Sequence, residues 1–243
     1  MDCPELLRCN ALILSKMKLS KRLLVIGLTI ILIAISSVAY FYFQKQAKEK
    51  EAEQIKILLV EINEAINLMD SVKAQMPKEL LEVHQFLIEK GQKNEIKFTQ
   101  IPSELKDFIL FHGAKNQILY ADPTSRLKPQ IWIPLLYHEA GHLYWHSKYP
   151  VETLEEFQGQ LYASEEHSYI VDAQAWNMVK KHFPVMEENL TSQELKLFNL
   201  YEKETSLYNK MIEGNAAAKA KWNEIIEADI KEQEKQQKIL FNK

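Results

Sequence analysis

The sequence predicts a mostly helical α+β protein with an N-terminal transmembrane helix, a small antiparallel β-sheet and long C-terminal helices. Three observations support this fold class. A run of 21 residues near the N-terminus is uncharged, and most of the remaining chain shows apolar residues at helical spacing. Only a short central part alternates apolar and polar residues as strands do. The 243 residues include just 6 glycines and 8 prolines, which is few for a loop-rich or all-β protein.

The uncharged run covers residues 23–43 and reads LLVIGLTIILIAISSVAYFYF. At about 1.5 Å per helical residue it spans roughly 30 Å, the thickness of the hydrocarbon core of a bilayer. Its aromatic end, residues 40–43, is typical of the membrane interface. Lys21 and Arg22 favour a short cytoplasmic N-terminus at residues 1–22. We therefore expect a signal anchor at residues 23–43 and an extracytoplasmic C-terminal domain.

A cleavable signal peptide is the alternative interpretation of the same run. Met17 would then be the start, in the stretch MKLSKR, and Ser37-Val38-Ala39 would be the cleavage site. The run stays apolar beyond Ala39, which favours an uncleaved anchor, whereas cleavage would give a secreted protein. Cys3 and Cys9 both precede the run, so the exported part contains no cysteine in either case.

Three regions are expected after the membrane segment. Residues 44–93 carry an apolar stripe at helical spacing and predict a helical stalk. Residues 94–185 form a central domain, and residues 186–243 form a C-terminal helical segment that a capping box of Thr191 and Glu194 opens. Apolar stripes of the stalk or of the C-terminal helices could pair with a second copy of the chain, giving a homo-oligomer.

The central domain begins with three predicted strands and continues with two helices. Glu95–Ile101 alternates apolar and polar residues, and Phe108–His112 and Gln117–Ala121 are short apolar runs around a tight loop. These segments predict the antiparallel sheet. Pro134 is well placed at the first position of a helix that ends near Ser147. A second amphipathic helix follows and ends before Pro184.

The helix after Pro134 carries an HExxH motif, His138-Glu139-Ala140-Gly141-His142. Residues four apart lie on one face of a helix, so the two imidazoles converge on one point. A zinc ion there would have two nitrogen ligands at about 2.0–2.1 Å. Glu139 lies near enough to take a proton from a water molecule that zinc activates. Chance predicts roughly 0.02 such motifs in a chain of this composition, so the signal is specific.

With this motif, residues 95–183 resemble the zinc metallopeptidases of the zincin type, in particular the compact gluzincin-like members. The resemblance implies a small β-sheet packed on an active-site helix, with zinc as the cofactor and a peptide or protein as the substrate. It also implies that His138 and His142 bind the metal and that Glu139 acts as the general base. Residues 94–185 would then be the catalytic domain.

The third zinc ligand is where the sequence departs from the family pattern. Gluzincins usually carry a Glu on the second helix with an Asp or Asn four residues later, but Ser168 stands four residues before Asp172. Glu166, 24 residues after His142, is the preferred candidate, Asp172 is the alternative, and Glu165 comes third. Asp172 could instead bind a ligand histidine through a hydrogen bond. If no acid reaches the metal, the site is inactive.

Other aromatic and histidine side chains receive weaker predictions. Three could donate a hydrogen bond to a developing oxyanion, although packing roles are more frequent: Tyr162, His167 and Tyr169. His146 continues the four-residue spacing beyond the metal and is expected at the surface. The expected core tryptophans are Trp132, Trp145 and Trp176.

Together these features predict a single-pass membrane-anchored zinc metallopeptidase that hydrolyses peptide bonds, with Glu139 as the general base. The alternative is a membrane-anchored helical interaction or scaffold protein with a vestigial or purely structural metal site. The stalk and the C-terminal helices would suit that role equally well. The net charge of −3 leaves no basic excess, which argues against a nucleic-acid partner.

Overall fold

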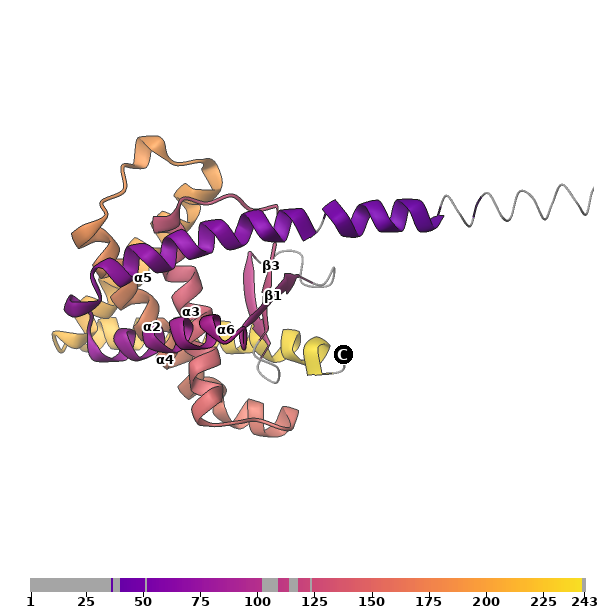
Figure 1. Cartoon of the computed structure of the whole chain (residues 1–243). Helices are drawn as coiled ribbons and strands as arrows, with labels where there is room; N and C mark the ends of the chain where they lie inside the picture. Colours follow the sequence, from indigo (N-terminus) through magenta and orange to yellow (C-terminus); the bar gives the residue numbers. More distant parts are fainter. Residues whose placement is uncertain are drawn as a thin grey trace, which may run out of the picture. The chain divides into compact units, whose positions relative to one another are not determined.

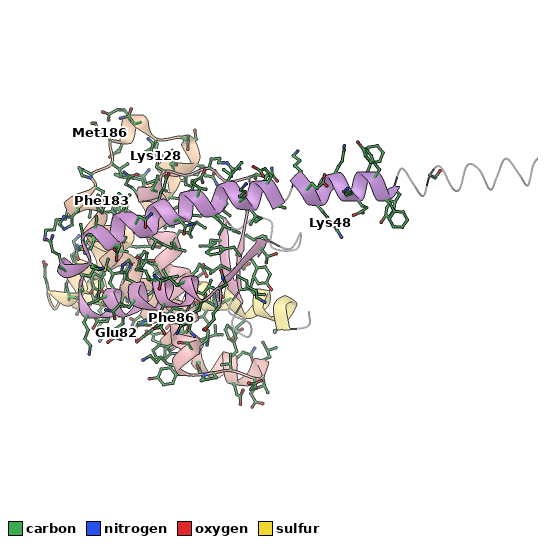
Figure 2. All side chains as sticks on the ribbon, viewed as in Figure 1. Lys48, Glu82, Phe86, Lys128, Phe183 and Met186 are labelled. Carbon is green, nitrogen blue, oxygen red and sulfur yellow. The ribbon has the colours of Figure 1, made fainter. Side chains whose placement is uncertain are left out.

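The computed structural model describes residues 36, 40–50, 52–101, 109–113, 118–122 and 124–241. They belong to two compact units, Met1–Ala52 and Glu53–Lys243. In the first unit, residues 40–50 are helical and exposed, and Figure 2 labels Lys48 among them. No helix within the described ranges is long and apolar enough to cross a bilayer. Most of the predicted span at residues 23–43 lies outside these ranges, so the anchor stays a prediction.

The second unit opens with a helix at residues 53–71, followed by the short 3-10 helix η1 (Lys73–Gln75) and by α2 (Lys78–Gln92). Each of the two longer helices buries one apolar face in the main core. Leu58, Ile62, Ala65 and Met69 come from the first helix, and Leu80, Val83, Phe86 and Leu87 come from α2. The predicted boundaries at residues 93 and 185 therefore fall inside one compact unit.

The sheet has three strands in the order β1-β3-β2. They are β1 (Lys97–Gln100), β2 (Leu110–Gly113) and β3 (Ile118–Ala121). β2 pairs with β3 in antiparallel fashion, but β1 pairs with β3 in parallel, so the prediction of a wholly antiparallel sheet is wrong. The chain reverses before β2 and again before β3, so that β1 and β3 run in the same direction.

β3, the central strand, buries one of its two faces. Leu119 and Ala121 are fully buried, while Ile118 and Tyr120 on the other side are only half-buried. The edge strand β2 is also buried, through Leu110 and His112. Figure 1 shows β1 and β3 side by side, and β2 lies against the helix that carries the HExxH motif.

In that helix, α3 (Pro129–Lys148), 12 of the 20 residues are buried. It begins at Pro129, five residues before the predicted start, with Pro129 at the favoured first position. Pro134 therefore lies inside the helix, where it removes one backbone N–H from the hydrogen-bond ladder. The flanking core residues include Trp132, which is fully buried as predicted.

A buried hydrogen-bond chain ties α3 to the two helices before the sheet. The Tyr137 hydroxyl lies 2.5 Å from Nδ1 of His84 on α2, and Nε2 of His84 lies 3.2 Å from Oδ1 of Asp70. Tyr137 is fully buried and His84 nearly so, while Asp70 is partly exposed. Since buried polar groups are costly without partners, this chain fixes the position of α3 next to the motif.

Three long helices complete the unit: α4 (Leu154–His182), α5 (Ser192–Ile212) and α6 (Ala216–Phe241), with a short 3-10 helix η3 (Glu187–Asn189) before α5. The predicted capping box of Thr191 and Glu194 is present at the start of α5. α4 packs against α3 and, through Tyr169 and Ala173, against a second core cluster with Trp222 of α6. The structure thus confirms a mostly helical fold with a small three-stranded sheet.

Candidate metal centre

The two motif histidines point to one place between α3 and α4. Their Nε2 atoms lie 3.3 Å apart. The His142 side chain is 2% exposed and that of His138 is 12% exposed. The i,i+4 spacing on α3 therefore brings the two imidazoles together, as predicted, at a position that is largely shielded from solvent.

The outer nitrogen of each ring has its own partner on α4. Nδ1 of His138 lies 3.0 Å from Oδ2 of Asp172, and Nδ1 of His142 lies 2.8 Å from Oγ of Ser164. A carboxylate only accepts hydrogen bonds, so His138 carries a proton on Nδ1, and Ser164 allows the same tautomer at His142. The Nε2 lone pairs then face each other.

In that tautomer two lone pairs at 3.3 Å repel each other unless a cation lies between them, whereas in the other tautomer Nε2–H of His142 donates directly to His138. Four-coordinate zinc with bonds of about 2.0–2.1 Å places neighbouring ligand atoms roughly 3.3–3.4 Å apart. The observed separation of 3.3 Å matches this value. A proton shared between the rings is the other cation that fits. Burial by itself lowers the pKa of His138, but the hydrogen bond to Asp172 and the negative charges of Asp172, Glu139 and Glu165 together outweigh it and raise that pKa to about 10.

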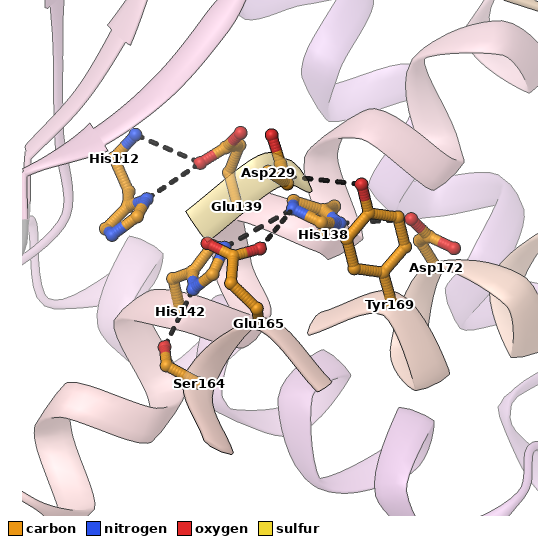
Figure 3. Close-up of polar contacts among 9 residues, drawn as sticks. All are labelled: His112, His138, Glu139, His142, Ser164, Glu165, Tyr169, Asp172 and Asp229. Atoms are coloured by element: carbon orange, nitrogen blue, oxygen red, sulfur yellow. Dashed lines mark hydrogen bonds and ion pairs between the residues drawn. The ribbon is translucent and has the colours of Figure 1, made fainter. Parts of the chain in front are cut away.

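Glu165 of α4 completes the group. Its Oε1 lies 3.4 Å from Nε2 of His142 and its Oε2 lies 3.7 Å from Nε2 of His138, as Figure 3 shows. The side chain is fully buried, and neither oxygen makes a hydrogen bond of normal geometry within the described part of the chain. Burial raises the pKa of the Glu165 carboxyl well above its ordinary value. His138, His142 and Glu165 could therefore hold a metal ion.

The structure brings Glu165, and not Glu166, to the two imidazoles. Ser164, Glu165, Ser168 and Asp172 lie on the buried face of α4 that meets α3, whereas Glu166 is turned about 100° further round the helix and is only half-buried. Distance along the chain, which favoured Glu166, does not determine this rotation. The order of candidates for the third ligand is corrected accordingly.

Asp172, the alternative third ligand, takes a different position. It bonds Nδ1 of His138, on the side of the ring opposite the shared point, and therefore orients a ligand instead of joining it. Burial raises the pKa of Asp172, while the bond to His138 lowers it. Ser164 plays the same orienting part for His142, and nothing in its sequence context indicated this role.

Glu139 faces away from α4, towards the sheet. Its Oε2 accepts two hydrogen bonds from His112 at the end of β2, one from the backbone N–H at 3.0 Å and one from Nδ1 at 2.9 Å. Glu139, His112 and His142 also have ligand-type atoms within 4.8 Å of one another. The His112 ring stacks on that of His142 at 4.1 Å and 15°, however. Nitrogen lone pairs lie in the ring plane, so stacked rings do not share an ion.

Of the three oxyanion candidates, only Tyr169 lies at the centre. Its ring stands edge-on to His138 at 4.8 Å, and its hydroxyl donates a hydrogen bond of 3.2 Å to Oδ2 of Asp229. Tyr162 is exposed, and His167 packs against Tyr144 outside the group. Asp229 was not expected at the site, because it follows the motif by almost ninety residues and only α6 brings it back (Figure 3).

His146 is buried, so its expected surface position is wrong. Its ring lies 5.9 Å from that of His112 and 5.5 Å from that of Phe157. One further turn of α3 does lead away from the metal position, as predicted, but towards a third, small core cluster of Val151, Phe157 and Leu161 instead of solvent. Trp176 is fully buried, as predicted, whereas Trp145 is only half-buried.

Comparisons of the chain with protein-family models, with curated proteins and with solved structures found no significant match. The resemblance to zincins therefore stands on the motif and on the geometry described above.

Gly141 allows α3 to approach α4 closely. A Cβ atom at this position would lie 2.9 Å from Oγ and 3.1 Å from Cα of Ser168. The serine hydroxyl could rotate, but the backbone of α4 would have to shift. Gly141→Ala should therefore destabilise the protein by about 1–3 kcal/mol, as overpacking does.

Urea denaturation measures this change, and Gly159→Ala is the matched control. Gly159 lies in α4 with nothing within 4 Å of its added Cβ, so its replacement should stabilise the protein by about 0.5–1 kcal/mol. Equal effects of the two substitutions would contradict the close approach.

The buried His146 side chain should make the folded protein less stable in acid. Burial lowers its pKa to about 3, from an ordinary value near 6.5. Between these values the unfolded chain binds the proton and the folded protein does not, so the free energy of unfolding falls as the pH drops below 6.5. Metal-free His146→Phe should lose less stability than the wild type, with a difference of at most about 3 kcal/mol at pH 4. Parallel curves of unfolding free energy against pH would contradict this.

Proposed function

We propose that the protein is a zinc-dependent metallopeptidase whose metal is held by His138, His142 and Glu165. One observation carries the proposal: two imidazole lone pairs and a buried carboxylate meet at separations of 3.3–3.7 Å, which suit the edges of a tetrahedral zinc site. Two nitrogens and one carboxylate oxygen are also the donor set of catalytic zinc sites with an open fourth position.

When bound, zinc would make a water molecule nucleophilic near neutral pH and would polarise the carbonyl of the substrate. The chain's own residues supply the remaining functions. Glu139 takes the proton from the attacking water and passes it to the leaving amine. Tyr169, beside His138, would donate a hydrogen bond to the developing oxyanion after its single hydroxyl proton leaves Asp229. Asp172 and Ser164 keep the two imidazoles in the tautomer that turns Nε2 to the metal.

The substrate is proposed to be a peptide or protein on the extracytoplasmic side. The proposal rests on the uncharged run at residues 23–43 and on the positive charges before it, which favour an anchored domain facing outwards. The absence of cysteine beyond this run is compatible with an oxidising compartment.

The second candidate is a membrane-anchored interaction protein with a purely structural metal. The burial of the ligands favours it, because structural zinc sites are closed by four protein ligands. Asp229 of α6 lies near enough to affect the pKa of Glu165 and is the residue that could close the site. This alternative predicts bound zinc without hydrolysis.

Metal binding tests the ligand set directly. In the protein covering residues 44–243, Glu165→Gln should weaken zinc binding by at least about 100-fold, since even partners of ligands contribute 10–100-fold. The neighbouring Glu166→Gln is the matched control and should bind zinc within about threefold of the wild type. Competition with a chromogenic chelator measures both. Loss of zinc in the Glu166 variant alone would overturn the assignment.

Hydrolysis tests the enzyme against the structural alternative. With the zinc-loaded protein and a fluorogenic peptide library, we expect cleavage that a chelator abolishes. Glu139→Gln should keep one zinc per chain and lower the rate by about 10²–10⁴-fold, because it removes the general base. Wild-type protein that binds zinc but cleaves no peptide at any pH would favour the interaction protein.

A further inference from the structure

His112 has no part in the HExxH motif, yet it makes both recorded hydrogen bonds to Glu139. The side chain is fully buried. Its backbone N–H can only donate, so Oε2 of Glu139 is the acceptor at 3.0 Å. Nδ1 of the same residue lies 2.9 Å from the same oxygen. With Glu139 ionised, the ring must also donate, which fixes the proton of His112 on Nδ1.

Two donors from one residue hold a carboxylate more firmly than one. The backbone donor comes from strand β2 and the ring donor from its side chain, so Oε2 is fixed from two directions (Figure 3). The carboxyl group is planar, and fixing one oxygen from two directions also fixes where Oε1 points. A glutamate has three rotatable bonds, and a general base misplaced by about 1 Å can lose 10²-fold in rate.

Stacking connects this support to the metal ligand. The His112 ring lies parallel to that of His142, with centroids 4.1 Å apart. The His112 ring therefore contacts His142, a predicted metal ligand, through its face and Glu139, the predicted base, through its edge. The sheet, through β2, sets the distance between the base and the metal position.

We propose that His112 is a positioning residue for the general base, an inference that rests on the proposed metallopeptidase function. Its ring N–H and backbone N–H fix Oε2 of Glu139 and turn the other oxygen towards the water that is activated beside His138, His142 and Glu165. His112 touches neither metal nor substrate in this role. The ring donor is the part that mutation can remove.

The chain offers three informative variants. His112→Phe keeps a flat ring on His142 but removes the donor. His112→Asn places an amide N–H near the position of Nδ1 and should restore it. His146→Phe is the matched control, since it makes the same replacement in the ring that stacks 5.9 Å from His112 and is not bonded to Glu139.

Cobalt(II) is the probe, because its visible absorption reports the geometry and partners of its ligands. All variants should bind Co²⁺ within about tenfold of the wild type, since His112 is not a ligand. We expect His112→Phe to change the visible band in the way that Glu139→Gln does, while His112→Asn and His146→Phe keep the wild-type spectrum. With a cleaved peptide, His112→Phe should lower kcat about 100-fold at unchanged KM, and His112→Asn about fivefold or less.

Each other result decides against one of the two proposals. A wild-type spectrum for His112→Phe, or a spectrum that Glu139→Gln leaves unchanged, overturns the positioning role while the metal site stands. If His112→Asn fails to restore the spectrum, the positioning role is also overturned. The spectral change in His112→Phe would then come from disturbed packing or folding at the site and not from the lost donor. Absence of Co²⁺ binding by the wild type overturns the metal site itself, and with it the role of His112.

Discussion

The candidate metal site depends on the convergence of two imidazole Nε2 atoms and one carboxylate in the buried contact between α3 and α4. At 3.3 Å the two Nε2 atoms have the spacing of neighbouring zinc ligands, and Glu165 lies where it could neutralise a bound cation. Neighbouring structure enforces this meeting. Asp172 fixes the tautomer of His138, and Ser164 holds the ring of His142. Gly141 lets the helices approach, and the chain of Tyr137, His84 and Asp70 holds α3 to the elements before the sheet.

What the sequence predicts well is local. The HExxH spacing places His138 and His142 on one face of a helix whatever the tertiary fold, and the structure shows their nitrogens together. Capping boxes and apolar periodicity are equally local, and the box of Thr191 and Glu194 is present. Glu139 is the motif residue that the sequence predicts to be the general base, but the direction of its side chain depends on a strand outside the motif.

The sequence does not predict features that depend on the rotation of a helix about its axis or on contacts between distant parts of the chain. Whether Glu165 or Glu166 reaches the imidazoles depends on a rotation of about 100° around the axis of α4, which the packing of α4 on α3 determines. The parallel pairing of β1 with β3 joins two strands that are not consecutive in the chain, which the apolar pattern of each strand does not predict. His112 and Asp229 lie on elements 26 residues before and 91 residues after His138, and only the assembled fold brings them near.

The charges around His138 show what a cation at this position would compensate. Glu165, Asp172, Glu204 and Asp229 all have a pKa that burial raises, to about 8 in the case of Glu204. A raised pKa means that burial disfavours the ionised form, so the burial of each of these groups costs stability. A core built for stability alone would replace them with apolar residues. A divalent ion between the imidazoles would favour the ionised form of the nearest acids, so the cost of burying them would be offset by binding of the metal.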